Sequence, residues 1–144
     1  MKGTITLFGG LLLAGAPTLA RAHVSVSGTA YAGQAAELTF GVGHGCEGSD
    51  TYKVKIGIPA GVTSVRPVAQ GSMKSSVEKD GAGNVTAVVF SKTDVEPGDT
   101  HVYRLGVRAR MPAKPFTTLV FPTWQYCRSA TGVDSMAAWV GTGG

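Results

Sequence analysis

Residues 51–58, with the sequence TYKVKIGI, alternate apolar and polar side chains over eight positions. The apolar side chains from Tyr52 to Ile58 would share one face of a strand, and Lys53 and Lys55 would share the other. A period of two residues is typical of a β-strand that packs one face on a core. The sequence Pro59-Ala60-Gly61 then predicts a turn. This segment therefore indicates a β protein.

The same signal recurs along most of the chain and is separated by turn sequences such as DGAGN and EPGD. Further strands are expected over residues 24–27, 36–42, 62–68, 73–78, 85–90, 101–108, 117–126 and 137–140. No stretch shows a helical period. Eight or nine short strands predict an all-β fold, an immunoglobulin-like sandwich, with Trp124 in its core. A closed barrel is the alternative, and the order of the strands is left open.

The composition of the chain excludes several classes of protein. The chain has 144 residues, of which 43% are hydrophobic and 15% charged, which is too apolar for a disordered chain and suits one domain. The 13 Lys and Arg exceed the 9 Asp and Glu, but they are scattered along the sequence. No basic run suggests a nucleic-acid partner.

Residues 1–22 have the pattern of a secretory signal peptide. Lys2 precedes an apolar segment at residues 5–16, and Ala20-Arg21-Ala22 forms a small-x-small cleavage site. The apolar segment is too short for a permanent membrane span, and no later segment has that length. We therefore expect a periplasmic or secreted protein made of residues 23–144, without a transmembrane anchor, that begins at His23.

Cys46 and Cys127 are the two cysteines of the chain. In an exported protein they most simply form one disulfide, which would hold the glycine-rich loop at residues 43–49 against the C-terminal segment. A thiolate metal site and a thiol that pairs with another protein are the alternatives. No CxxC spacing favours either alternative.

A histidine at the start of the mature chain offers two nitrogen ligands, the α-amine and the imidazole. Such a pair suits Cu(II), which binds most tightly among the divalent first-row metals and accepts nitrogen and oxygen ligands. The alternative is that His23 follows the cleavage site by chance. The other histidines are His44, in the loop at 43–49, and His101, which is expected at the surface.

Several stretches spread over residues 22–139 resemble the YcnI-like copper-binding domain family of exported bacterial proteins. They are AHVSV at 22–26, FGVGHGCEGSDT at 40–51, IPAGV at 58–62 and VEPG at 95–98. Phe121-Pro122 with Gln125 and Cys127, and Ala138-Trp139, complete the set. The chain departs from the family at Gly71-Ser72, where members often have Gly-Trp.

The resemblance implies a β-sandwich that binds Cu(II) through a single-histidine brace. Its ligands would be the amine and imidazole of His23 and the carboxylate of Glu47, with Trp139 packed against the metal. His44 is a candidate for an additional ligand. The implied function is copper trafficking, buffering or homeostasis, with the copper ion and other copper-handling proteins as partners and no enzymatic activity.

Two other functions are weighed against this one. A metal-free adhesion or interaction module would need no ligand set. A copper mono-oxygenase would need a second histidine, which only His44 or His101 could provide, and neither has a diagnostic spacing.

Overall fold

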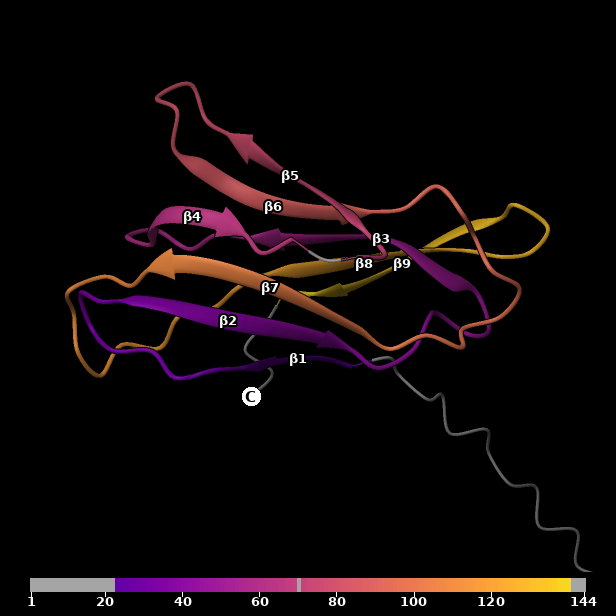
Figure 1. Ribbon diagram of the computed structural model, residues 1–144, viewed down its shortest axis with the longest axis horizontal. Coiled ribbons are helices and arrows are strands. Elements are labelled where there is room, and N and C mark those ends of the chain that lie inside the picture. Colours follow the sequence, from indigo (N-terminus) through magenta and orange to yellow (C-terminus); the bar gives the residue numbers. More distant parts are fainter. Residues whose placement is uncertain (1–22, 70, 141–144) are drawn as a thin grey trace, which may run out of the picture.

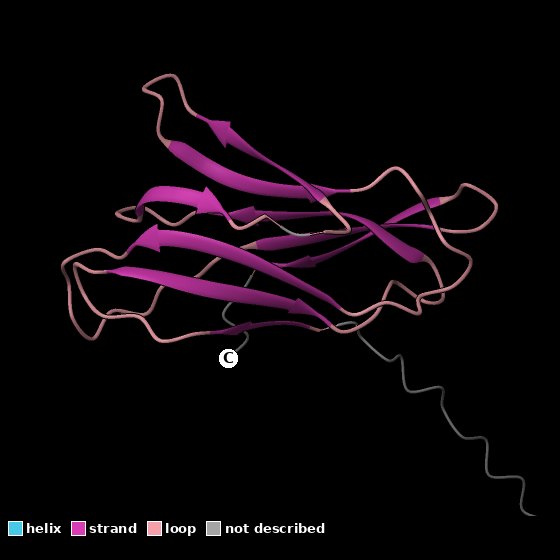
Figure 2. Ribbon diagram, viewed as in Figure 1, coloured by secondary structure: helices cyan, strands magenta, loops and turns pink. Residues whose placement is uncertain are grey.

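The computed structural model describes residues 23–69 and 71–140 as two packed antiparallel sheets, and none of these residues is helical (Figures 1 and 2). The first sheet has the order β1-β2-β7-β4, with β1 (Val24–Ser27), β2 (Ala35–Val42), β7 (Tyr103–Arg110) and β4 (Thr63–Pro67). The second has the order β5-β6-β3-β8-β9, with β5 (Lys74–Lys79), β6 (Val85–Ser91), β3 (Asp50–Gly57), β8 (Thr123–Arg128) and β9 (Asp134–Trp139). The predicted all-β sandwich is confirmed, and the barrel alternative is wrong.

Inward-facing side chains of both sheets form the core, as alternation in the sequence predicts. The largest fully buried apolar ones are Phe40, Val42, Val54, Ile56, Val88, Phe90, Leu105 and Val107. Phe121, in the segment before β8, packs edge-on against Phe40 with ring centroids 5.6 Å apart. This segment thus closes the core between the two sheets.

The alternation in residues 51–58 predicted Tyr52 on the buried face, but Tyr52 does not lie there. The pairing of β3 with β8 shifts register between Thr51 and Lys53, so a bulge reverses the side-chain direction at this point. Thr51 is fully buried instead, and the Tyr52 ring lies beneath the guanidinium of Arg128 at 4.4 Å.

The aromatic strand predicted at residues 117–126 is shorter and starts later. Pro122 has no N–H to donate to a ladder, and β8 begins only at Thr123. Within β8, Thr123, Gln125 and Cys127 face inward. Trp124 faces outward beside Lys55, so its predicted place in the core is wrong.

The predicted signal peptide, residues 1–22, lies outside the described residues. Among residues 23–69 and 71–140, no helix is long and apolar enough to cross a membrane.

Candidate functional site

His23 and Trp139 meet where edge strands of the two sheets come together. β1 starts directly after His23, and β9 ends at Trp139. The two rings lie 5.7 Å apart between centroids and are tilted by 42°. The structure therefore brings two of the three predicted copper-site residues, one from each end of the domain, into one place.

The indole of Trp139 carries an unusual polar group. Its Nε1 is buried and has no hydrogen-bond partner among the described residues. A buried N–H without an acceptor is uncommon and costs about 1–3 kcal/mol.

The loop at residues 43–49 starts beside His23. Val24 pairs with Val42, so the same register extended by one residue sets His23 opposite Gly43. The loop ends in a tight turn in which Cys46 and Ser49 exchange two backbone hydrogen bonds, of 3.0 and 2.9 Å.

Glu47 and Gly48 are the two central residues of that turn, and both have positive φ, of 47° and 82°. This is the pattern of a type I′ turn, in which Gly, Asn and Asp are favoured at both positions. A glutamate there strains the backbone, and such strain tends to cluster at functional sites. The Glu47 side chain is exposed.

Two side chains of β8 hold this loop in place. Cys127 forms the predicted disulfide with Cys46, with their Cα atoms 5.8 Å apart. Gln125 donates from Nε2 to the carbonyl of His44 and to Oγ1 of Thr51, both at 2.8 Å. The disulfide prediction is confirmed, and its thiolate and intermolecular alternatives are wrong.

The positioning role of Gln125 is not evident from residue types alone, because glutamine is common at protein surfaces. Apart from the family resemblance, its signal in the sequence is its place two residues before Cys127, on the same face of a strand. Its Oε1 is buried and has no partner among the described residues, so one acceptor is free beneath the loop.

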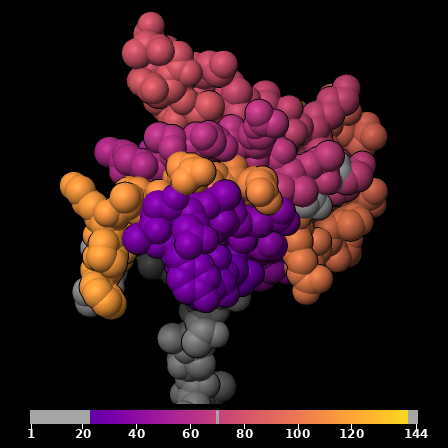
Figure 3. Space-filling model, turned by 60° about the vertical axis from the view of Figure 1, so that its left-hand side comes forward, coloured from indigo at the N-terminus to yellow at the C-terminus, as the bar shows by residue number. Residues whose placement is uncertain are grey.

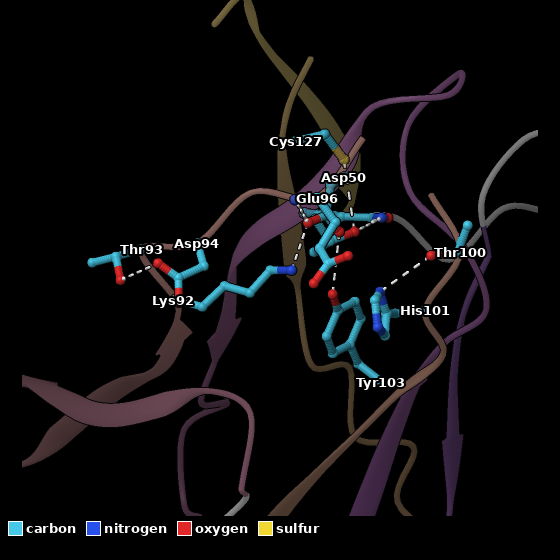
Figure 4. Close-up of polar contacts among 11 residues, drawn as sticks. Asp50, Lys92, Thr93, Asp94, Glu96, Thr100, His101, Tyr103 and Cys127 are labelled. Carbon is cyan, nitrogen blue, oxygen red and sulfur yellow. Dashed lines mark hydrogen bonds and ion pairs between the residues drawn. The ribbon is translucent and has the colours of Figure 1, made fainter. Parts of the chain in front are cut away.

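Asp50 forms a buried polar cluster at the foot of the loop (Figure 4). It accepts hydrogen bonds from Lys92 Nζ at 2.5 Å, the N–H of Glu96 at 2.8 Å and the Tyr103 hydroxyl at 3.2 Å. Burial alone would raise the pKa of Asp50, but the bonds from Lys92 and Glu96 outweigh burial and lower it. This cluster holds the segment after β6 against β3 and β7.

The other two histidines have different surroundings. Half-buried His44 places Nδ1 2.7 Å from the carbonyl of Gly45 and 3.6 Å from Oδ2 of Asp99. Exposed His101 lies beside Tyr103, with centroids 6.1 Å apart. Each histidine thus has neighbours other than the His23–Trp139 pair.

No group of three or more His, Cys, Asp or Glu side chains is arranged to hold a metal within residues 23–69 and 71–140. A brace does not require such a group, because one N-terminal histidine provides two nitrogens. Imidazole, amine and carboxylate donors suit Cu(II). The structure brings His23 and Trp139 into contact, and Glu47 lies in the turn next to Cys46.

Residues 23–141 match the model of a family described as "Domain of unknown function (DUF1775)". The fold is similar to that of an uncharacterized protein from Nocardia farcinica, whose crystal structure "reveals an immunoglobulin-like fold". That match has 22% sequence identity and a TM-score of 0.68 and covers 85% of this chain and 86% of the other. It confirms the immunoglobulin-like sandwich. No curated protein matches the chain.

Proposed function

This chain belongs to the DUF1775 family, and we propose that it is an exported Cu(II)-binding protein of copper trafficking, buffering or homeostasis. The observation that carries the proposal is the contact between the rings of His23 and Trp139, 5.7 Å apart beside the loop of Glu47. Copper is the cargo here, and the protein is not an enzyme. The resemblance to YcnI-like copper-binding domains supports the same reading.

The proposed ligands have different roles in binding Cu(II). The α-amine and imidazole of His23 provide two nitrogens from one residue, so little chain entropy is lost when the second one binds. Glu47 contributes a carboxylate that offsets the charge of the ion. The strained backbone at Glu47 supports a functional reason for a glutamate in this turn.

Trp139 shields one side of the proposed site. Its ring is half-buried at the end of β9 and lies against the imidazole of His23. An apolar ring beside the metal lowers the local dielectric and limits the approach of water. The copper would then sit at the rim of the sandwich, where a partner protein can reach it.

The test compares a protein that begins at His23 with one that carries a single additional residue before it. The additional residue turns the amine into an amide and leaves the imidazole, Glu47, Trp139 and the fold unchanged. The free form should bind Cu(II) far more tightly and give a different electron paramagnetic resonance spectrum. Because protons compete for both nitrogens, its affinity should fall as the pH falls.

His101→Ala is the matched control, since this exposed histidine lies beside Tyr103 and away from the proposed ligands. It should bind copper as the parent protein does. Equal affinity and identical spectra for the free and blocked forms would refute the brace and direct attention to His44. A metal-free interaction module predicts no spectral change in any form.

A further inference from the structure

Three loops come together at the end of the sandwich opposite His23. They are residues 28–34, 58–62 and 111–122, and they meet around Pro112. The N–H of Gly33 donates to the carbonyl of Pro112 at 3.0 Å, and a Cβ built on Gly61 would lie 3.3 Å from the Pro112 ring. We call this surface the apolar end.

Large apolar side chains protrude from the apolar end into solvent. Phe116 is fully exposed, and Tyr31 is 66% exposed. They flank a shallow hollow lined by Met111, Pro112 and Leu119. Figure 3, turned toward this end, shows an orange segment, near residues 110–120 on the colour bar, projecting beside the indigo N-terminal part. Exposed apolar patches of this kind mark interaction surfaces.

The backbone presents Phe116 to solvent at a cost. Its φ is +58°, in the left-handed region that a bulky residue rarely adopts. Pro115 and Phe116 lie in a turn whose left-handed position would suit glycine or asparagine better, and the phenylalanine ring contributes nothing to the core. The position therefore points to a contact with something outside the chain.

The loops of the apolar end are basic, and acidic side chains lie both beside this end, at Glu37 and in the turn with Glu78 and Asp80, and at the opposite end. The three loops of the apolar end contain no Asp or Glu and one cation, Lys114, and Arg110 lies at their edge and donates to the carbonyl of Gly33. Glu47, Asp50 and the acidic residues of the segment 94–99 lie at the opposite end, where β2 ends and β7 begins. Apolar side chains flanked by the cations Lys114 and Arg110 complement an anionic, amphipathic surface.

We propose that the apolar end docks on the surface of an anionic lipid bilayer. Phe116 and Tyr31 enter the interfacial region, where aromatic rings are favoured, and Lys114 and Arg110 lie at the level of the phosphate groups. The eight residues of β2 separate this end from His23 by about 23 Å. This proposal does not depend on copper binding.

The test is co-sedimentation of the copper-free protein with vesicles. Vesicles that contain phosphatidylglycerol and phosphatidylcholine should bind the protein, pure phosphatidylcholine vesicles should bind it much less, and salt should weaken binding. Phe116→Asn removes the ring and introduces a residue that tolerates the left-handed backbone, so it should weaken vesicle binding without straining the loop. Lys114→Gln removes one cation and should weaken partitioning by about fivefold. Neither variant should lower the unfolding temperature, because both side chains are exposed.

Val133→Ser is the control, because Val133 is 65% exposed at the turn between β8 and β9, at the other end of the molecule. It should leave vesicle binding unchanged. Absence of binding to anionic vesicles, equal binding to neutral ones, or an equal loss in Val133→Ser would overturn the proposal. So would self-association in light scattering that Phe116→Asn abolishes, since the apolar end would then be an interface between copies.

Discussion

The backbone of Glu47 links local strain to the proposed chemistry. A left-handed conformation costs a residue with a Cβ about 1–2 kcal/mol. The turn tolerates it because the disulfide at Cys46 and the paired backbone bonds to Ser49 fix the chain on both sides. The same constraints limit where the carboxylate of Glu47 can reach, which is useful for a ligand.

Replacing Glu47 by glycine should separate stability from copper binding. Glu47→Gly relieves the backbone strain, which favours the folded state. Glycine also makes the unfolded chain more flexible, which costs about 0.5–1 kcal/mol, less than the strain. The free energy of unfolding should therefore rise by up to about 1 kcal/mol. Copper affinity should fall roughly tenfold to a hundredfold, as expected for a lost charge-assisted contact. Urea unfolding and copper titration measure the two effects.

Glu47→Gln is the matched variant, because it keeps the strain and removes the charge. It should lose copper affinity without the gain in stability. If both variants bind copper as the parent does, Glu47 is not a ligand.

The buried ion pair of Asp50 and Lys92 should make the free energy of unfolding depend on pH. Burial opposes both charges, but the bonds from Lys92 and from the N–H of Glu96 outweigh it and lower the pKa of Asp50 from 3.8. The pKa of Lys92 is raised from 10.5, because its bond to Asp50 and its contact with Tyr103 outweigh burial. The lowered pKa of Asp50 stabilises the folded state above pH 3.8, and this stabilisation is lost as the pH falls through the folded pKa of Asp50. The raised pKa of Lys92 stabilises the folded state as well, and that stabilisation is lost only above pH 10.5. Asp50→Asn leaves the ammonium buried without its counter-charge and should cost about 3–5 kcal/mol at pH 7.

Urea unfolding from pH 7 down to pH 3 measures this effect. The gap in stability between parent and Asp50→Asn should narrow as the pH falls below about 4, because the parent then loses its charged pair. Asp50→Asn combined with Lys92→Met removes both charges and should recover part of the loss. A gap that stays constant over this range would assign the loss to packing rather than to charge.

At the scale of single strands, alternation predicts most of the sandwich and fails where the backbone departs from regular geometry. Within the described part of the chain, sequence patterns located eight of the nine strands to within a few residues, and β8 is the exception. Tyr52 was assigned to the wrong face because a bulge at Thr51 and Lys53 cannot be seen in side-chain types. Strand 117–126 was drawn too long because Pro122 delays the ladder.

β8 also shows why part of the site could not be predicted. Its inward face is polar, with Thr123 and Gln125 beside Cys127, whereas its aromatic side chains point outward. A hydrophobicity rule assigns Trp124 to the core and Gln125 to the surface, which reverses the observed arrangement. Only the long-range contacts of Gln125 with His44 and Thr51 reveal its place.

Gln125→Leu should loosen the loop without breaking the disulfide. The carbonyl of His44 and the hydroxyl of Thr51 lose a donor, and a buried unpartnered group costs about 1–3 kcal/mol. We expect a drop in the free energy of unfolding of that size and faster amide hydrogen exchange in residues 43–49. Gln125→Glu, which keeps the shape but lacks the amide donor, should give the same faster exchange. Unchanged exchange in both variants would mean that the disulfide alone holds the loop.

At the scale of the whole molecule, the strand order carries information that alternation lacks. The two sheets leave β1 and β9 as edge strands, and this topology brings His23 and Trp139 together across more than a hundred residues of sequence. Strand patterns in the sequence do not specify that His23 and Trp139 are neighbours. The resemblance to a known family supplied the pair, whereas composition and spacing alone supplied only His23 as an unusual N-terminus.

The disulfide extends its constraint over most of the sandwich. Cys46 and Cys127 are 81 residues apart in sequence, and the loop they close contains β3 to β7 and most of β8. For a loop of this length, the chain-entropy model gives roughly 4–5 kcal/mol as an upper estimate of the stabilisation. That is a large share of the about 5–15 kcal/mol that keeps a domain folded.

Cys46→Ala combined with Cys127→Ala should therefore lower the free energy of unfolding by up to about 4–5 kcal/mol and the melting temperature by roughly 15 °C. Copper affinity should fall as well, although His23 and Glu47 remain, because the turn of Glu47 loses its covalent attachment to β8. Calorimetry and copper titration below the lowered melting temperature measure both effects on folded protein. In calorimetry of the copper-free protein, adding reductant should shift the parent toward the behaviour of the variant and leave the variant itself unchanged. A loss of less than about 1 kcal/mol would show instead that the unfolded chain is already compact near the crosslink, so that closing the loop costs little entropy.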